Sequence, residues 1–152
     1  MNKLIETIDL TKVYGEKETS VTALNSITTA FNENQFTAIM GPSGSGKSTL
    51  LHCLAGLDKV TSGSILINGI DLASLNDKEL TKMRRDSFGF VFQAFNLIPT
   101  LTAEENITLP SSIAGRKPED EWVEQVIEAM DIGDRLGHRP VSYTHLTLPT
   151  KR

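Results

Sequence analysis

The stretch Gly41-Pro42-Ser43-Gly44-Ser45-Gly46-Lys47-Ser48 decides how this sequence is interpreted. It fits the pattern G-x-x-x-x-G-K-[ST] at every position. Glycines let the backbone come close to a phosphate, so that the amide groups of such a loop point inward and bind an anion. The apolar run Phe36 to Met40 predicts a strand before the loop, and the leucines of Ser48 to Leu57 predict a helix after it. The positive N-terminal end of that helix would strengthen anion binding.

Two side chains of the loop are suited to a nucleotide triphosphate. Lys47 supplies a positive charge to the β- and γ-phosphates, and Ser48 offers a hydroxyl to Mg²⁺, whose other ligands are mostly water and phosphate oxygens. The alternative is a turn rich in glycine and serine that matches the pattern by chance. The predicted strand and helix on either side argue against chance, so the sequence predicts phosphate binding at residues 41–48.

Composition and charge narrow the class of protein. The 152 residues have the length of one domain, with 39% hydrophobic and 22% charged residues, as in soluble globular proteins. The 15 basic and 19 acidic residues give a formal charge of −4, without the basic surplus of a nucleic-acid-binding protein. The single Cys53 cannot form an internal disulfide, which indicates a reducing compartment. The sequence has no apolar run of about 18 residues, so we expect a peripheral subunit if the chain works at a membrane.

Strand and helix signals alternate along the chain, which predicts an α/β fold. Strands are expected at Leu4–Val13, Thr22–Phe31 and Ser64–Asn68, and Phe88–Phe92 is rich in β-forming residues. Two capping boxes predict helix starts, at Asn76 with Glu79 and at Thr102 with Glu105.

Pro118 opens a further predicted helix. Trp122, Val126 and Met130 form an apolar stripe on it, which we interpret as core or as a helix interface.

Some polar residues have a plain structural interpretation. His52 and Cys53 lie on the helix after the loop, where packing is the simpler explanation. The basic residues Lys82, Arg84 and Arg85 are interpreted as a solvated helix face, with a docking patch as the alternative.

Several motifs in order resemble those of ATP-binding-cassette ATPases. Met40–Leu51 resembles the Walker A region of that family, and Thr61–Ile65 with Asn68-Gly69 resembles its next strand and turn. Phe90-Val91-Phe92-Gln93, followed by Thr102–Asn106, resembles its Q-loop. The likeness runs from about Leu4 to Pro140. It implies a P-loop NTPase fold of the ATP-binding-cassette type, with a β-rich N-terminal part, the start of a helical subdomain and an incomplete C-terminus.

The resemblance also implies ATP and Mg²⁺ as ligands and assigns further residues to them. Tyr14 would stack on adenine, Thr49 would contact the α-phosphate, and Gln93 would approach Mg²⁺ and the attacking water. An ordinary tyrosine at a strand end and an ordinary surface glutamine are the alternatives. The implied metal-binding residues are Ser48 and Gln93. The implied ATP-binding residues are Tyr14, Gly41, Pro42, Ser43, Gly44, Ser45, Gly46, Lys47, Ser48 and Thr49.

The function implied by the resemblance is that of the ATP-hydrolysing subunit of a transporter. Phe88–Pro99 and Leu54–Asp58 are most similar to the macrolide-export and lipoprotein-release group, which implies export. Transmembrane permease subunits and a second ATP-binding subunit, in a head-to-tail dimer, are the implied partners, at the cytoplasmic face of the cell membrane. The alternatives are a soluble cassette ATPase of repair or translation, and a fragment that binds nucleotide without turnover.

After Pro140 the sequence departs from the family pattern. Members of the family continue into a Leu-Ser-Gly-Gly signature, a Walker B strand that ends in Asp-Glu, and a switch histidine. Val141–Thr150 instead resembles one reading frame of a transposase-end adapter. We therefore expect residues 1–140 to be a partial nucleotide-binding domain and residues 141–152 a non-native tail, with a divergent native C-terminus as the alternative. The resemblance implies that the catalytic carboxylate after the Walker B strand is absent, so no catalytic residue is assigned and we expect no turnover from these 152 residues. The missing segment would also supply central strands of the sheet, so we expect exposed apolar faces, poor solubility and at best weak nucleotide binding.

Overall fold

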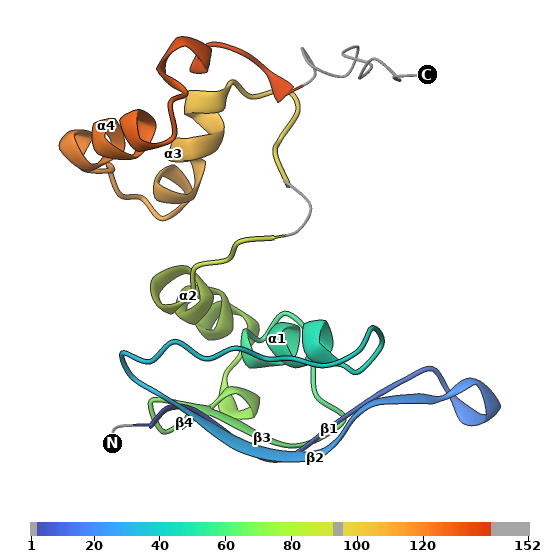
Figure 1. The fold of residues 1–152 in the computed structure, drawn as a ribbon. Coiled ribbons are helices and arrows are strands. Elements are labelled where there is room, and N and C mark those ends of the chain that lie inside the picture. The colour runs from blue at the N-terminus through green and yellow to red at the C-terminus, as the bar shows by residue number, and fades with distance from the viewer. Residues whose placement is uncertain (1–2, 93–95, 141–152) are drawn as a thin grey trace, which may run out of the picture. The chain divides into compact units, whose positions relative to one another are not determined.

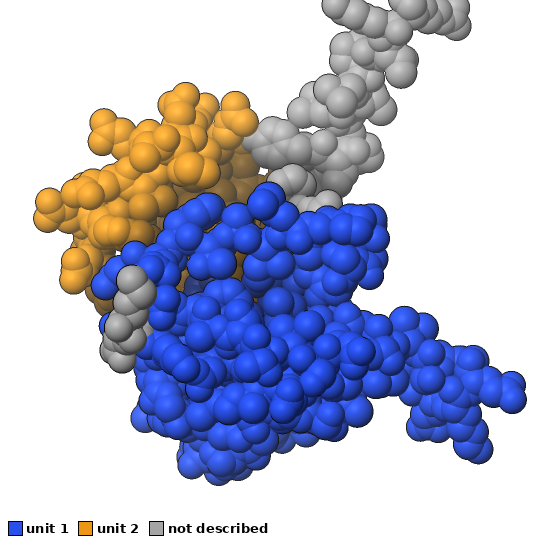
Figure 2. Space-filling model, turned by 60° about the horizontal axis from the view of Figure 1, so that its bottom comes forward, with its two compact units in different colours: residues 1–89 blue, residues 90–152 orange. Residues whose placement is uncertain are grey.

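The computed structural model describes residues 3–92 and 96–140. The chain divides into two compact units, residues 1–89 and residues 90–152, each of which is described by itself (Figure 2). The assignments made to Gln93 and to residues 141–152 lie outside the described residues.

The first unit is built on a four-stranded antiparallel sheet in the order β2-β1-β3-β4 (Figure 1). Its strands are β1 (Lys3–Tyr14), β2 (Val21–Asn32), β3 (Ser62–Ile67) and β4 (Ile70–Asp71). Ile5 of β1 lies opposite Phe31 of β2 and opposite Ile67 of β3, so apolar side chains line up across the sheet. The three strands expected in this unit from Leu4–Val13, Thr22–Phe31 and Ser64–Asn68 are confirmed.

Two helices complete the first unit, α1 (Lys47–Leu54) and α2 (Asp77–Ser87), with short 3₁₀ turns at Lys17–Thr19 and Leu72–Ser74. Cys53 and Leu54 of α1 pack with Leu10, Leu24 and Ile65 of the sheet in one buried cluster. Met83 of α2 packs against the same cluster. Cys53 is therefore a packing residue, as expected, whereas His52 is exposed. The helix predicted to run to Leu57 ends at Leu54.

One polar side chain, Thr7 of β1, is fully buried in this core. Its hydroxyl donates a hydrogen bond to the Ile27 carbonyl (2.9 Å) and accepts one from the Thr29 amide (3.0 Å). Because both capacities of the hydroxyl are used, its burial carries little penalty. The two bonds also fix the register of β1 against β2.

The second unit contains α3 (Ala103–Ile113), α4 (Asp120–Ala129) and a 3₁₀ turn at Gly133–Arg135. The capping box at Thr102 and Glu105 forms as predicted, as does the box at Asn76 and Glu79 in the first unit. The amides of Ala103 and Glu104 donate to the carbonyls of His138 and Leu136, so residues 136–138 are bound to the start of α3.

The stripe predicted on α4 is only partly correct. Val126 is half-buried, together with Val123 and Ile127, which follow the spacing of one helix face. Trp122 and Met130 are 60% and 66% exposed. The core interpretation is therefore wrong for these two residues.

Two strand signals are not borne out. Phe36–Met40 is irregular, with Phe36 98% and Met40 87% exposed. No strand pairs with this run in the described part of the chain, and an apolar run forms a strand only beside a neighbour. Phe88 follows the last residue of α2, and Phe90 and Phe92 stack with their ring centroids 5.4 Å apart in an irregular segment.

Arg84 also differs from the expected solvated face. Its guanidinium donates to the Gly56 carbonyl (2.7 Å), beyond the C-terminal end of α1, and to the Thr81 hydroxyl (3.1 Å). Arg85 is exposed and pairs with the adjacent Asp86. Arg84 therefore links α2 to α1. Among the described residues, no helix has the length and apolar character needed to cross a bilayer.

Candidate functional site

The predicted phosphate-binding loop forms a tight turn directly before α1. Gly46 precedes the first residue of the helix and has a φ of +85°, a left-handed conformation that side chains disfavour. A Cβ atom on Gly46 would lie 2.4 Å from the carbonyl oxygen of Ala23 in β2. Glycine is therefore required here both by the backbone conformation and by the contact with the sheet.

Gly44 has a similar conformation but a different environment. Its φ is +79°, and a Cβ atom there would have no heavy atom within 4 Å. The space above Gly44 is open, so a ligand can approach the backbone at this point of the loop.

Lys47 closes the loop on itself. Its ammonium group donates to the carbonyl oxygens of Gly41 (2.9 Å) and Pro42 (2.7 Å), and the Ser45 hydroxyl lies 3.4 Å away. The Ser45 amide donates to the Pro42 carbonyl at 3.3 Å. The loop therefore fixes the positive charge of Lys47 next to its own backbone, within reach of an anion bound by the loop.

The first turn of α1 adds hydrogen-bond donors to this charge. The Leu50 amide donates to the Gly46 carbonyl (2.8 Å), which is the first bond of the helix. The amides before it have no acceptor within the helix, as at every helix start, and they carry the positive end of the helix dipole. The Ser48 side chain is exposed and Thr49 is half-buried in this turn. An ammonium group, helix amides without an acceptor in the helix and an exposed hydroxyl together suit a phosphate with its Mg²⁺.

Tyr14, the residue expected to stack on adenine, lies at the end of β1. Its hydroxyl interacts with the Thr49 side chain and donates a hydrogen bond to the Asp58 carboxylate. Tyr14 is 40% exposed, so part of the ring faces solvent. The structure thus brings Tyr14 of β1 close to the first turn of α1.

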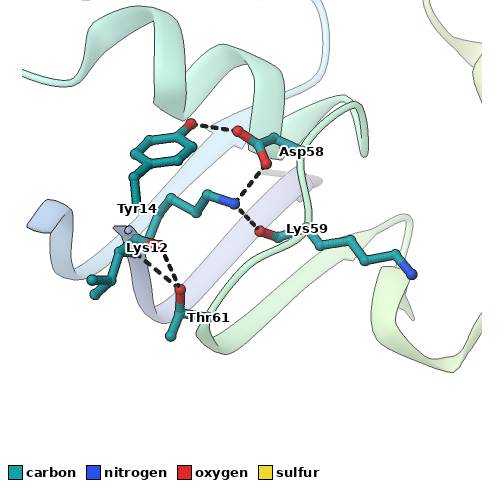
Figure 3. Close-up of polar contacts among 6 residues, drawn as sticks. Lys12, Tyr14, Asp58, Lys59 and Thr61 are labelled. Atoms are coloured by element: carbon teal, nitrogen blue, oxygen red, sulfur yellow. Dashed lines mark hydrogen bonds and ion pairs between the residues drawn. The ribbon is translucent and has the colours of Figure 1, made fainter. Parts of the chain in front are cut away.

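Two charged residues around Tyr14 were not singled out from the sequence. Figure 3 shows Lys12 and Tyr14 reaching from β1 toward Asp58. The Lys12 ammonium donates to the Asp58 carboxylate (2.6 Å) and to the Lys59 carbonyl (2.6 Å), and lies 4.6 Å from the centre of the Tyr14 ring. Spacing by two on a strand does place Lys12 and Tyr14 on one face, but no local signal points to Asp58, 44 residues away from Tyr14.

These contacts shift the ionisation of all three groups. The hydrogen bond from Lys12, followed by that from Tyr14, lowers the pKa of Asp58 below 3.8. The same bonds raise the pKa of Lys12 above 10.5 and the pKa of Tyr14 above 10.0. Cys53 nearby is a different case, since burial raises the pKa of its thiol and keeps it in the inert, neutral form.

The shifts predict how the cluster contributes to stability across pH. A lowered carboxylate pKa stabilises the fold above pH 3.8, and that contribution is lost as pH falls through the folded-state pKa. The raised Lys12 pKa stabilises the fold below pH 10.5, and that contribution is lost as pH rises further. The difference in thermal stability between wild type and Asp58→Asn should therefore be constant between about pH 5 and pH 9 and shrink outside that range. Thermal unfolding followed by circular dichroism measures it, and a difference that changes steadily from pH 5 to pH 9 would contradict the assignment.

The chain is similar to known proteins in sequence and in fold. Residues 24–148 match the family model described as "ABC transporter". The chain is 45% identical over 139 residues to a macrolide export ATP-binding/permease protein of Marinobacter nauticus, covering 90% of this chain and 22% of that protein. It is 42% identical over 142 residues to the lipoprotein-releasing system ATP-binding protein of Geobacter metallireducens, covering 92% of this chain and 63% of that protein.

A solved structure extends the likeness to the fold. The ATP-binding cassette MJ0796 of Methanocaldococcus jannaschii, a dimer in a post-hydrolysis state with ADP and phosphate bound, has a TM-score of 0.78 and 40% sequence identity. The match covers 90% of this chain and 62% of that one. The chain therefore spans less than two thirds of the length of each of these relatives.

Proposed function

The chain belongs to the ABC transporter family, and from that premise we propose that it is the nucleotide-binding part of a transporter ATPase, with ATP and Mg²⁺ as its ligands. The proposal rests on the position of the Lys47 ammonium group. It donates hydrogen bonds to the loop carbonyls of Gly41 and Pro42 at the N-terminal end of α1. A positive charge fixed at a helix start, beside the open backbone of Gly44, suits the β- and γ-phosphates of a triphosphate.

In this proposal, other residues contact the metal ion, the α-phosphate and the adenine base. The exposed Ser48 hydroxyl would ligate Mg²⁺, and Thr49 would contact the α-phosphate. Gln93, which lies outside the described residues, is proposed as a second Mg²⁺ ligand on the sequence alone. Held there, Mg²⁺ would supply positive charge to balance the charge that develops on the phosphates during transfer. Tyr14 stacks on the adenine ring through its exposed surface.

The proposed role of the whole protein follows from the relatives. Hydrolysis of ATP on the cassette would drive movement of a substrate through permease subunits at the cytoplasmic face of the membrane, with export as the direction. The macrolide export relative combines an ATP-binding part and a permease in its printed name, which supports a transporter over a soluble cassette protein. The dimeric MJ0796 cassette supports a pair of cassettes as the working form.

Calorimetric titration with ATP, AMP and inorganic tripolyphosphate, each with Mg²⁺ and up to millimolar concentration, tests the proposal. ATP should bind more tightly than AMP by about tenfold or more, because AMP lacks the phosphates that Lys47 contacts. Tripolyphosphate should compete with ATP. Equal binding of ATP and AMP, or no binding of ATP at all, would overturn the proposed function.

A further inference from the structure

Asp58 lies just after α1, the helix that begins with the phosphate-binding loop, and contacts Tyr14, the proposed adenine contact. Its backbone amide donates to the His52 carbonyl (3.3 Å), and the neighbouring Leu57 amide donates to the same oxygen (2.9 Å). Asp58 is therefore fixed to the C-terminal part of α1, the helix that begins with the phosphate-binding loop.

The side chain of Asp58 holds two residues of β1 at once. One carboxylate oxygen accepts from Lys12 at 2.6 Å, and the other accepts from the Tyr14 hydroxyl (Figure 3). The Lys12 side chain is only 11% exposed, so this ion pair is partly shielded from solvent. The shielded ion pair restricts the rotamers of Lys12 more than an exposed pair does, and the hydrogen bond to the second carboxylate oxygen restricts Tyr14.

The two contacts also decide which face of the Tyr14 ring is available. Lys12 lies over one face, 4.6 Å from the ring centre. A planar base can therefore stack only on the opposite face, and the 40% exposure of Tyr14 leaves surface for it.

We propose that Asp58 is a positioning residue of the nucleotide site, which holds Lys12 and Tyr14 so that one fixed face of the tyrosine ring meets the adenine of ATP. The inference rests on the proposed function. Asp58 itself touches neither base nor phosphate in this arrangement. Asp58 fixes the position of the Tyr14 ring relative to α1, and therefore relative to the phosphate-binding loop at the start of that helix.

The test compares a ligand that has a base with one that lacks it. ATP and inorganic tripolyphosphate are titrated into wild type, Asp58→Ala, Asp58→Asn and Glu18→Ala, with Glu18 as an exposed acidic control near the same strand end. Asp58→Ala should weaken ATP binding about three- to tenfold, a part of what base–aromatic stacking contributes, and leave tripolyphosphate binding within about twofold. Asp58→Asn should restore part of the loss, since its amide oxygen can still accept a hydrogen bond.

A double-mutant cycle with Tyr14→Ala separates positioning from a general loss of structure. Because Asp58 acts through Tyr14, the double variant Asp58→Ala/Tyr14→Ala should bind ATP no more weakly than Tyr14→Ala alone. Additive losses, an unchanged ATP affinity in Asp58→Ala, or equal losses for ATP and tripolyphosphate would each overturn the inference while the proposed function stands. Failure of wild type to bind either ligand would overturn the proposed function and this inference with it.

Discussion

Replacing Lys47 with alanine should weaken ATP binding about ten- to a hundredfold, because a charge-assisted hydrogen bond to phosphate contributes roughly 1.5–3 kcal/mol. In the structure the Lys47 ammonium is held by the carbonyls of Gly41 and Pro42 rather than by an acidic side chain. Neutral carbonyls position the charge without cancelling it. Most of its attraction therefore remains for an incoming phosphate.

The same substitution should leave the fold almost unchanged. The bonds of Lys47 stay within one exposed loop, so their loss affects the sheet and the core little. Lys78→Ala, on the exposed first turn of α2, is the matched control for removing one positive charge. Calorimetry with ATP and with tripolyphosphate should show the same proportional loss for both ligands in Lys47→Ala. ATP binding within about twofold of wild type would mean that Lys47 is not the phosphate contact.

The sequence predicts an element best when the residues that determine it are close together in the chain. The strand expected at Leu4–Val13 forms at Lys3–Tyr14. Helices begin after Asn76 and after Thr102 as predicted, because the two residues of each capping box are only three positions apart. The helix after the loop also forms. Gly46 marks its start and the leucine spacing its apolar face, and both signals lie within two helical turns of each other. In the helices, the interactions that decide where the element begins are between close neighbours in the sequence, whereas the strand also needs its pairing partners β2 and β3.

The sequence fails where a distant partner decides the outcome. Phe36–Met40 has the residues of a buried strand, yet it is exposed and irregular because no described strand lies beside it. The roles of Asp58 and Arg84 depend on partners 44 and 28 residues away, Tyr14 and Gly56. Such pairings depend on how the elements pack together, which no local pattern records. The cluster of Lys12, Tyr14 and Asp58 could therefore be identified only from the folded structure.

Replacing Gly46 with alanine should destabilise the first unit by about 2–5 kcal/mol. One part of the cost, about 1–2 kcal/mol, comes from placing a side chain at a left-handed φ of +85°. The other part, about 1–3 kcal/mol, comes from overpacking, because the new Cβ atom would lie 2.4 Å from the Ala23 carbonyl oxygen of β2. Relief of that contact requires the loop, α1 or β2 to move. Denaturant unfolding followed by circular dichroism measures the loss.

Gly44→Ala is the control that separates these two costs. Its φ of +79° imposes nearly the same backbone strain, but its Cβ atom would meet no heavy atom within 4 Å. We therefore expect Gly44→Ala to lose only about 1–2 kcal/mol. Equal losses in the two variants would show that strain alone matters and that the loop does not press against β2. A larger loss in Gly46→Ala, accompanied by weaker tripolyphosphate binding, would show that the sheet holds the loop in the conformation that receives phosphate.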